Sequence, residues 1–167
     1  HETSAVALTW TLYLLNKHPE HWETIRAEAA KCSFDSMQSV MQMQYTRQVI
    51  EESMRIYPPA WMIDRLSNDD DEILGFRFPK DSFILLWLYG LHHDEDVWPD
   101  HNRFDPSRFD PDKKNEIPPY SYVPFGGGPR LCIGYQFAML EMIQVIGHIA
   151  LNFNISVIDE HVDIKPL

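Results

Sequence analysis

The sequence of 167 residues is long enough for one domain of ordinary size, and 44% of its residues are hydrophobic, which indicates a protein with a packed core. Its formal net charge of −11 excludes a protein that binds nucleic acid through a basic face. Two cysteines, Cys32 and Cys132, are too few for a disulfide scaffold, so a reducing compartment is expected.

The first half of the sequence is helical in pattern. Residues 3–15 are apolar on most sides, which predicts a helix buried in a larger body. Pro19 suits the first turn of a second helix that extends to about residue 31. A looser stretch over residues 33–42 precedes a third helix over residues 45–56, which the following pair of prolines ends.

The second half begins with strands and ends in a helix. Alternating apolar residues from Ile63 to Phe78, interrupted by an Asn-Asp turn, predict a small antiparallel sheet. The apolar run over residues 83–91 is too short to span a membrane and predicts a buried strand that continues into a helix. A long proline-rich loop over residues 94–134 indicates a site, and residues 134–152 predict a last buried helix. Nothing marks a domain boundary, so residues 1–167 are expected to form one mainly α domain with a minor antiparallel sheet.

Cys132 lies in a glycine-rich loop just before the last predicted helix. The helix N-terminus and the charge of Arg130 favour its thiolate, which is typical of a metal ligand or a nucleophile. A small buried apolar residue is the alternative interpretation. A zinc site is less favoured, because no second cysteine or closely spaced histidine pair stands nearby, and a nucleophile would need a histidine base that is not placed locally.

The same loop resembles the haem-binding signature of the cytochrome P450 family, Phe-x-x-Gly-x-Arg-x-Cys-x-Gly, at its five fixed positions: Phe125, Gly128, Arg130, Cys132 and Gly134. The resemblance implies that Cys132 is the axial ligand of the iron in haem b. It implies further that Phe125, Gly126 and Gly134 shape the cofactor site. Arg130 would then pair with a haem propionate.

Two further segments carry the resemblance. The Glu52-Ser-Met-Arg55 step, with the prolines after it, resembles the family's K-helix, and the Pro-Ser-Arg-Phe segment that contains Arg108 resembles the family's Pro-x-Arg-Phe. In the family these three charged side chains form a buried structural ion network, which is stable only when every partner is present. Glu23 and Arg26 have the same spacing, and there we expect a solvated surface pair.

Arg65 matches the family's strand arginine that contacts the other haem propionate, although an ordinary exposed strand arginine is the alternative. Glu2 and Thr3 resemble the centre of the family's I-helix, where an acid followed by threonine relays protons to dioxygen. They are therefore the catalytic candidates, because both side chains can take part in proton transfer. A helix cap is the commoner role for such a pair.

All these motifs occur in the family's order, so the resemblance covers essentially the whole chain. It implies an incomplete cytochrome P450 fold, the C-terminal part from the middle of the I-helix to just past the L-helix. The implied activity is that of a haem-thiolate monooxygenase. Such an enzyme inserts one oxygen atom of O2 into an organic substrate, with electrons from NAD(P)H delivered by a reductase or a ferredoxin- or flavodoxin-type donor.

Residues 60–63 match a stretch that borders the substrate pocket in that family, so a lipophilic substrate is expected. The alternatives are a haem-thiolate peroxygenase or isomerase, or a haem-binding fragment without activity, and we expect the 167 residues alone to be inactive. The expected location is the cytoplasmic side, either soluble or membrane-attached through an N-terminal segment upstream of His1.

Overall fold

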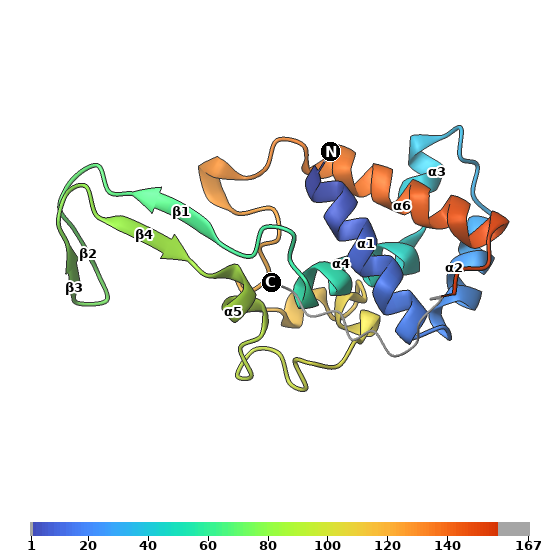
Figure 1. Cartoon of the computed structure of the whole chain (residues 1–167), viewed down its shortest axis with the longest axis horizontal. Helices are drawn as coiled ribbons and strands as arrows, with labels where there is room; N and C mark the ends of the chain where they lie inside the picture. Colours follow the sequence, from blue (N-terminus) through green and yellow to red (C-terminus); the bar gives the residue numbers. More distant parts are fainter. Residues whose placement is uncertain (1, 157–167) are drawn as a thin grey trace.

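The structure is a computed structural model that describes residues 2–156. It consists of a helical body and a long two-stranded arm that projects from it (Figure 1). The helices are α1 (Glu2–Lys17), α2 (His21–Ala29), α3 (Met37–Met41), α4 (Gln44–Ile56), α5 (Leu88–His92) and α6 (Tyr135–Asn152). The strands are β1 (Ile63–Leu66), β2 (Asp71–Ile73), β3 (Phe76–Phe78) and β4 (Phe83–Leu86). Three 3₁₀ turns complete the structure: η1 (Pro106–Phe109), η2 (Lys114–Glu116) and η3 (Gly128–Arg130).

Helix α4 is the centre of the body. It packs against α1, α2, α5, α6 and η1, and every residue from Gln48 to Ile56 is buried. The core around it is formed by fully buried aliphatic side chains from four helices, including Leu15, Ile25, Ile50 and Ile146. Because α4 is buried on all sides over its second half, its charged residues there must find partners inside the protein.

The mainly helical fold class predicted from the sequence is confirmed, with one element added. The stretch over residues 33–42 contains the short helix α3, which the sequence did not predict. The Ser36 hydroxyl caps it by accepting a hydrogen bond from the Ser39 N–H at 3.3 Å. A five-residue helix has too few turns to show a periodic apolar pattern.

The arm consists of two antiparallel hairpins, one inside the other. Strand β1 pairs with β4, with Ile63 opposite Leu86, and β2 pairs with β3 at the tip (Figure 1). The predicted sheet is present, but the prediction that the strand at residues 83–86 is buried is wrong. Phe83 is 65% exposed and Leu85 is 53% exposed.

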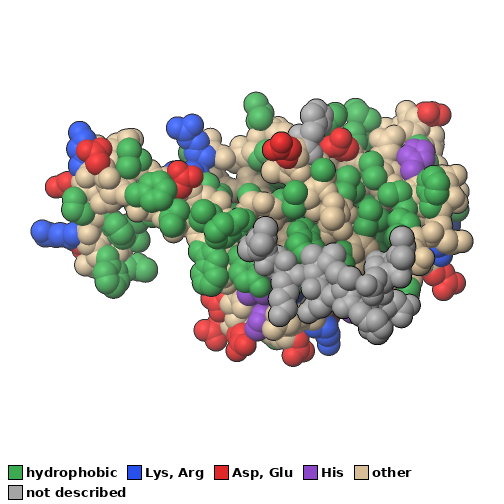
Figure 2. Space-filling view, in the orientation of Figure 1, with side chains coloured by type: hydrophobic (Ala, Val, Ile, Leu, Met, Phe, Trp, Pro, Cys, Tyr) green, Lys and Arg blue, Asp and Glu red, His purple; other side chains and the backbone are tan. Residues whose placement is uncertain are grey.

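The two long apolar helices are also less buried than predicted. Helix α1 buries one face and leaves Val6 42% exposed, while α6 leaves Phe137 66% exposed. Figure 2 shows hydrophobic side chains at the surface of both the arm and the helical body. None of the helices within residues 2–156 is both long and apolar enough to cross a membrane.

Candidate functional site

A cavity of about 880 Å³ lies where α1, β1, the cysteine loop (residues 125–134) and α6 meet. Its volume falls in the range of about 300–1,000 Å³ that is usual for small-molecule and cofactor sites. The structure brings seven of the predicted site residues to its wall: Thr3, Arg65, Phe125, Gly126, Arg130, Cys132 and Gly134. Glu2 is exposed at the start of α1 and is not part of this lining, and its neighbour His1 lies outside the described residues.

The cysteine loop is held in shape by its own backbone. Gly126 and Gly128 have φ values of +75° and +61°, which a residue with a side chain adopts only at a cost. The Cys132 N–H donates to the Phe125 carbonyl at 3.0 Å, and the Leu131 N–H donates to the Gly128 carbonyl at 3.1 Å. These bonds fold the loop back on itself and fix the backbone that carries the thiol.

Cys132 is exposed, so its interpretation as a small buried apolar residue is wrong. Gly134 caps α6, and a Cβ added there would lie 3.9 Å from the Cys132 sulfur, so the thiol stands just before the positive end of an 18-residue helix. No described residue donates a hydrogen bond to this sulfur. Among the described residues, Cys132 does not belong to a cluster of three metal-binding side chains.

Two arginine side chains also line this cavity. Arg65 and Arg130 are both exposed, and neither forms an ion pair with a carboxylate of residues 2–156. The Arg65 guanidinium donates one hydrogen bond, to the carbonyl of Asp64 at 2.7 Å. An exposed thiol beside two unpaired guanidiniums fits a cofactor that carries both a thiophilic metal ion and carboxylates, as haem does.

Two charged residues of α4, Glu52 and Arg55, are fully buried. The Arg55 Nε and Nη2 atoms donate to the two oxygens of Glu52 at 2.7 and 2.9 Å, and neither side chain is exposed. Arg55 also donates to the carbonyls of His92 (2.9 Å), His101 (2.8 Å) and Arg103 (3.4 Å). One guanidinium thus joins α4 to α5 and to the loop after it.

Arg108 completes the arrangement from η1. Its Nε lies 3.5 Å from Glu52 Oε1, and its Nη2 donates to the carbonyls of Pro99 at 2.6 Å and Asp100 at 3.1 Å. Burial raises the pKa of the Glu52 carboxyl above its usual value, while the hydrogen bonds from Arg55 act in the opposite direction. The Asp105 N–H, which donates to Glu52 Oε1 at 3.0 Å, and the charge of Arg108 also lower this pKa and so oppose the effect of burial.

A histidine that the sequence did not single out connects this network to the start of the cysteine loop. His92 is fully buried, and its Nε2 accepts a hydrogen bond from the Val123 N–H at 3.0 Å. Burial lowers the pKa of His92 to about 4, which keeps the ring neutral and able to accept. Nearby, the Tyr122 hydroxyl donates to the Glu51 carbonyl at 2.8 Å. Both bonds tie the segment before Phe125 to the core.

The prediction that Arg26 forms a solvated surface pair with Glu23 is wrong. Its Nε donates to the Ala150 carbonyl and its Nη2 to the Asn154 side-chain oxygen, both at 3.0 Å. No ion pair joins it to Glu23, although the structure describes both residues. The i, i+3 spacing permits a pair, but α6 packs alongside α2 and offers free C-terminal carbonyls, which arginine satisfies well.

The sequence interpretation also missed part of the cavity wall on α6. Phe137, Glu141 and Met142 line the cavity together with Gly134. Gly134, Phe137 and Glu141 follow one another at intervals of three and four residues, and Met142 is next to Glu141, so the four residues lie on one side of the helix. That periodicity was the available signal, although the apolar residues around the rest of the helix conceal it.

The chain is similar to proteins of a known family. The family description Cytochrome P450 matches residues 1–166. An "Ultra-long-chain fatty acid omega-hydroxylase" from Homo sapiens is 37% identical over 164 residues, covering 94% of this chain and 31% of that protein. "Cytochrome P450 4F5" from Rattus norvegicus is 37% identical over 99% of this chain and 33% of its own length. "Cytochrome P450 3A15" from Cavia porcellus is 35% identical over 92% and 31%.

The chain therefore belongs to the cytochrome P450 family, a family of haem-thiolate oxidoreductases. It spans about a third of the length of the curated relatives that it matches. Helices α1 and α6 each leave apolar side chains exposed, such as Val6 and Phe137.

Proposed function

We propose that this chain supplies the thiolate side of the haem site in a monooxygenase that inserts one oxygen atom of O2 into an organic substrate. The observation that carries the proposal is a cavity lined by the exposed thiol of Cys132 and by Arg65 and Arg130, neither of which forms an ion pair with a carboxylate of residues 2–156. A thiolate ligand gives bound haem the electron density that oxygen chemistry needs.

Each residue at the cavity has a distinct part in the proposal. Cys132 binds the iron, while Arg65 and Arg130 bind the propionates and so fix the orientation of the cofactor. Thr3 faces the same cavity from α1, and its hydroxyl can both accept and donate a proton. Glu2, exposed next to it, exchanges protons with solvent. This pair of residues favours reduction of O2 over an isomerase reaction, which needs no proton delivery to oxygen.

The proposed substrate is lipophilic. Ala60, Met62 and Ile63 contribute apolar surface to the cavity at the start of β1, and Met62 is 41% exposed there. The human relative is named for an ultra-long-chain fatty acid, which belongs to this class of substrate, but a relative of similar identity from the 3A group carries no substrate in its name. We therefore propose the class and not a particular compound.

Electrons are proposed to come from NAD(P)H through a reductase or a ferredoxin- or flavodoxin-type donor, and the protein is expected on the cytoplasmic side, soluble or attached to a membrane by residues outside this sequence. The test uses the full-length protein that carries this chain, with a reductase, NAD(P)H, a panel of fatty acids and ¹⁸O2. One ¹⁸O atom in the product supports a monooxygenase. Product without ¹⁸O, or product formed only when peroxide replaces O2 and the reductase, contradicts it. The Cys132→Ser variant should make no product, and Cys32→Ser is the matched control.

A further inference from the structure

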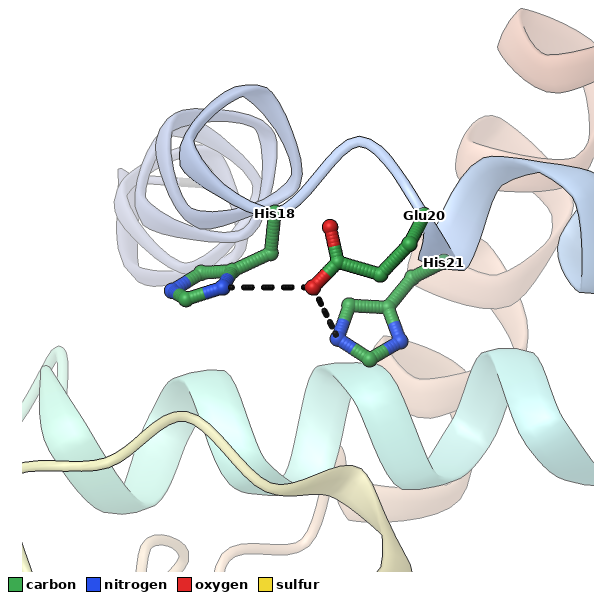
Figure 3. A group of neighbouring side chains, drawn as sticks. All are labelled: His18, Glu20 and His21. Atoms are coloured by element: carbon green, nitrogen blue, oxygen red, sulfur yellow. Dashed lines mark ion pairs between the residues drawn. The ribbon is translucent and has the colours of Figure 1, made fainter.

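The three residues between α1 and α2 and the first residue of α2 read His-Pro-Glu-His, and the three polar side chains of this segment converge. His18 Nδ1 lies 3.6 Å from Glu20 Oε1, and His21 Nε2 lies 3.9 Å from the same oxygen (Figure 3). All three ligand atoms lie within 4.8 Å of one another. This cluster is at the α1–α2 junction, is not part of the cavity described above and has no part in the proposed oxygen chemistry.

We propose that His18, Glu20 and His21 form a zinc-binding site at this junction. Zinc bonds of about 2.0–2.1 Å in tetrahedral geometry place neighbouring ligand atoms about 3.4 Å apart. The His18–Glu20 and His21–Glu20 separations exceed that value by about 0.2 and 0.5 Å, and all three ligand atoms lie within 4.8 Å of one another, so closure around an ion needs side-chain rotations that draw the three atoms together. The same separations are too long for ordinary hydrogen bonds, which lie between about 2.7 and 3.2 Å.

The backbone holds the cluster in a single turn. The His21 N–H donates to the His18 carbonyl at 3.3 Å, and the Trp22 N–H donates to the Pro19 carbonyl at 3.2 Å. Pro19 fixes one φ angle of this turn. The ligands therefore come from a rigid segment and lose little backbone freedom when an ion binds.

A hydrogen bond with Tyr45 orients the His21 ring as a metal site requires. Its Nδ1 forms a hydrogen bond of 2.6 Å with the Tyr45 hydroxyl of α4. With the proton on Nδ1, the ring donates to Tyr45 and presents the lone pair of Nε2 to Glu20. Metal-binding histidines commonly donate their other N–H to an oxygen partner, which fixes tautomer and direction.

The surroundings leave room for an ion while shielding one side. The Phe104 ring packs 5.2 Å from the His18 ring and 5.3 Å from the His21 ring, centroid to centroid, and is itself buried. The side chains of His18 and Glu20 are 36% and 65% exposed, so a water molecule can reach the fourth position.

The donor set selects zinc among the common cellular ions. Two imidazoles and one carboxylate with an open fourth position form a ligand set of zinc enzymes, whereas magnesium and calcium prefer oxygen ligands in larger number. Copper(II) binds such sites more tightly by the general order of metal affinities, so it serves as a positive probe in vitro. An ion here would tie the end of α1 to the start of α2.

The test is zinc titration calorimetry of the haem-loaded full-length protein, combined with X-ray absorption at the zinc edge. We expect one zinc site, nitrogen and oxygen ligands without sulfur, and no binding of magnesium or calcium. The double variant with His18→Gln and His21→Gln should bind zinc at least about tenfold more weakly. His148→Gln is the matched control, because His148 is exposed on α6 and stacks on Phe34, and it should leave the affinity unchanged.

Tyr45→Phe keeps the ring but removes the hydroxyl, so it tests the site without removing a ligand. This substitution should weaken zinc binding by about tenfold. In EDTA, the variant and the parent protein should have the same thermal unfolding temperature. Equal zinc affinity in the parent and the double variant, a sulfur ligand at the zinc edge, or no binding at micromolar zinc would each overturn the proposal.

Discussion

The buried ion network predicts that replacement of Arg55 lowers the free energy of unfolding more than replacement of Arg108. Arg55→Ala removes the two guanidinium hydrogen bonds to the buried Glu52 carboxylate, which keeps the Asp105 N–H as a donor at 3.0 Å, and it removes three hydrogen bonds to buried or part-buried carbonyls. Removal of one partner from a buried pair costs about 3–5 kcal/mol of unfolding free energy. Arg108→Ala leaves the Arg55–Glu52 pair intact and removes a contact at 3.5 Å and two carbonyl bonds, so we expect a smaller loss of about 1.5–3 kcal/mol.

The assay is urea unfolding of the full-length protein, with haem content measured in parallel. Arg77→Ala is the matched control, because Arg77 pairs with Glu72 at 3.6 Å on the arm and its side chain is 89% exposed. Its effect should stay within about 0.5 kcal/mol. Equal losses for Arg55→Ala and Arg77→Ala, or a larger loss for Arg108→Ala than for Arg55→Ala, would refute this interpretation of the network.

Three further predictions follow from single residues. The pKa of His92 is about 4 in the folded protein and 6.5 ordinarily, so between these pH values the unfolded chain binds a proton that the folded protein does not. The free energy of unfolding, measured by urea unfolding, should therefore fall by about 3 kcal/mol as the pH falls from about 6.5 to 4. His92→Gln should remove this contribution of His92 to the pH dependence. Thr3→Ala should keep haem content but lower the product formed per NAD(P)H consumed, and unchanged coupling would remove Thr3 from proton delivery. Gly126→Ala should cost about 1–2 kcal/mol because φ is +75°, whereas Gly134→Ala should be nearly neutral, and equal thermal unfolding of the two would contradict this.

The sequence predicted those features that depend on local pattern. The helices α1, α2, α4 and α6 follow from runs of helix-forming residues and, for the first three, from prolines next to their ends, and the structure confirms each of them within a few residues. The loop motif likewise pointed to a set of residues that the fold gathers at one cavity, although Arg65 and Cys132 are 67 residues apart in sequence.

Features that depend on partners distant in the chain could not be predicted in this way. The pairing of β1 with β4 around an inner hairpin skips the nearest strand, which local alternation does not reveal. Arg26 donates a hydrogen bond to the Ala150 carbonyl near the C-terminus of α6, and His92 accepts one from the Val123 N–H. Both contacts join residues that are distant in the sequence. The exposure of Phe83 depends on what surrounds the arm, so its apolar character alone wrongly predicted a buried strand.

The central claim is that the Cys132 thiolate is the axial ligand of the haem iron, and the absorption spectrum of the reduced carbon monoxide complex tests it most directly. In the full-length protein the Soret band should be red-shifted, because a thiolate donates more charge to iron than imidazole does. Cys132→His should lose that band even if it still holds haem. Cys32→Ser should keep it, because Cys32 follows the C-terminus of α2 and does not line the cavity. A thiolate band that survives in Cys132→His, or disappears in Cys32→Ser, would contradict the claim.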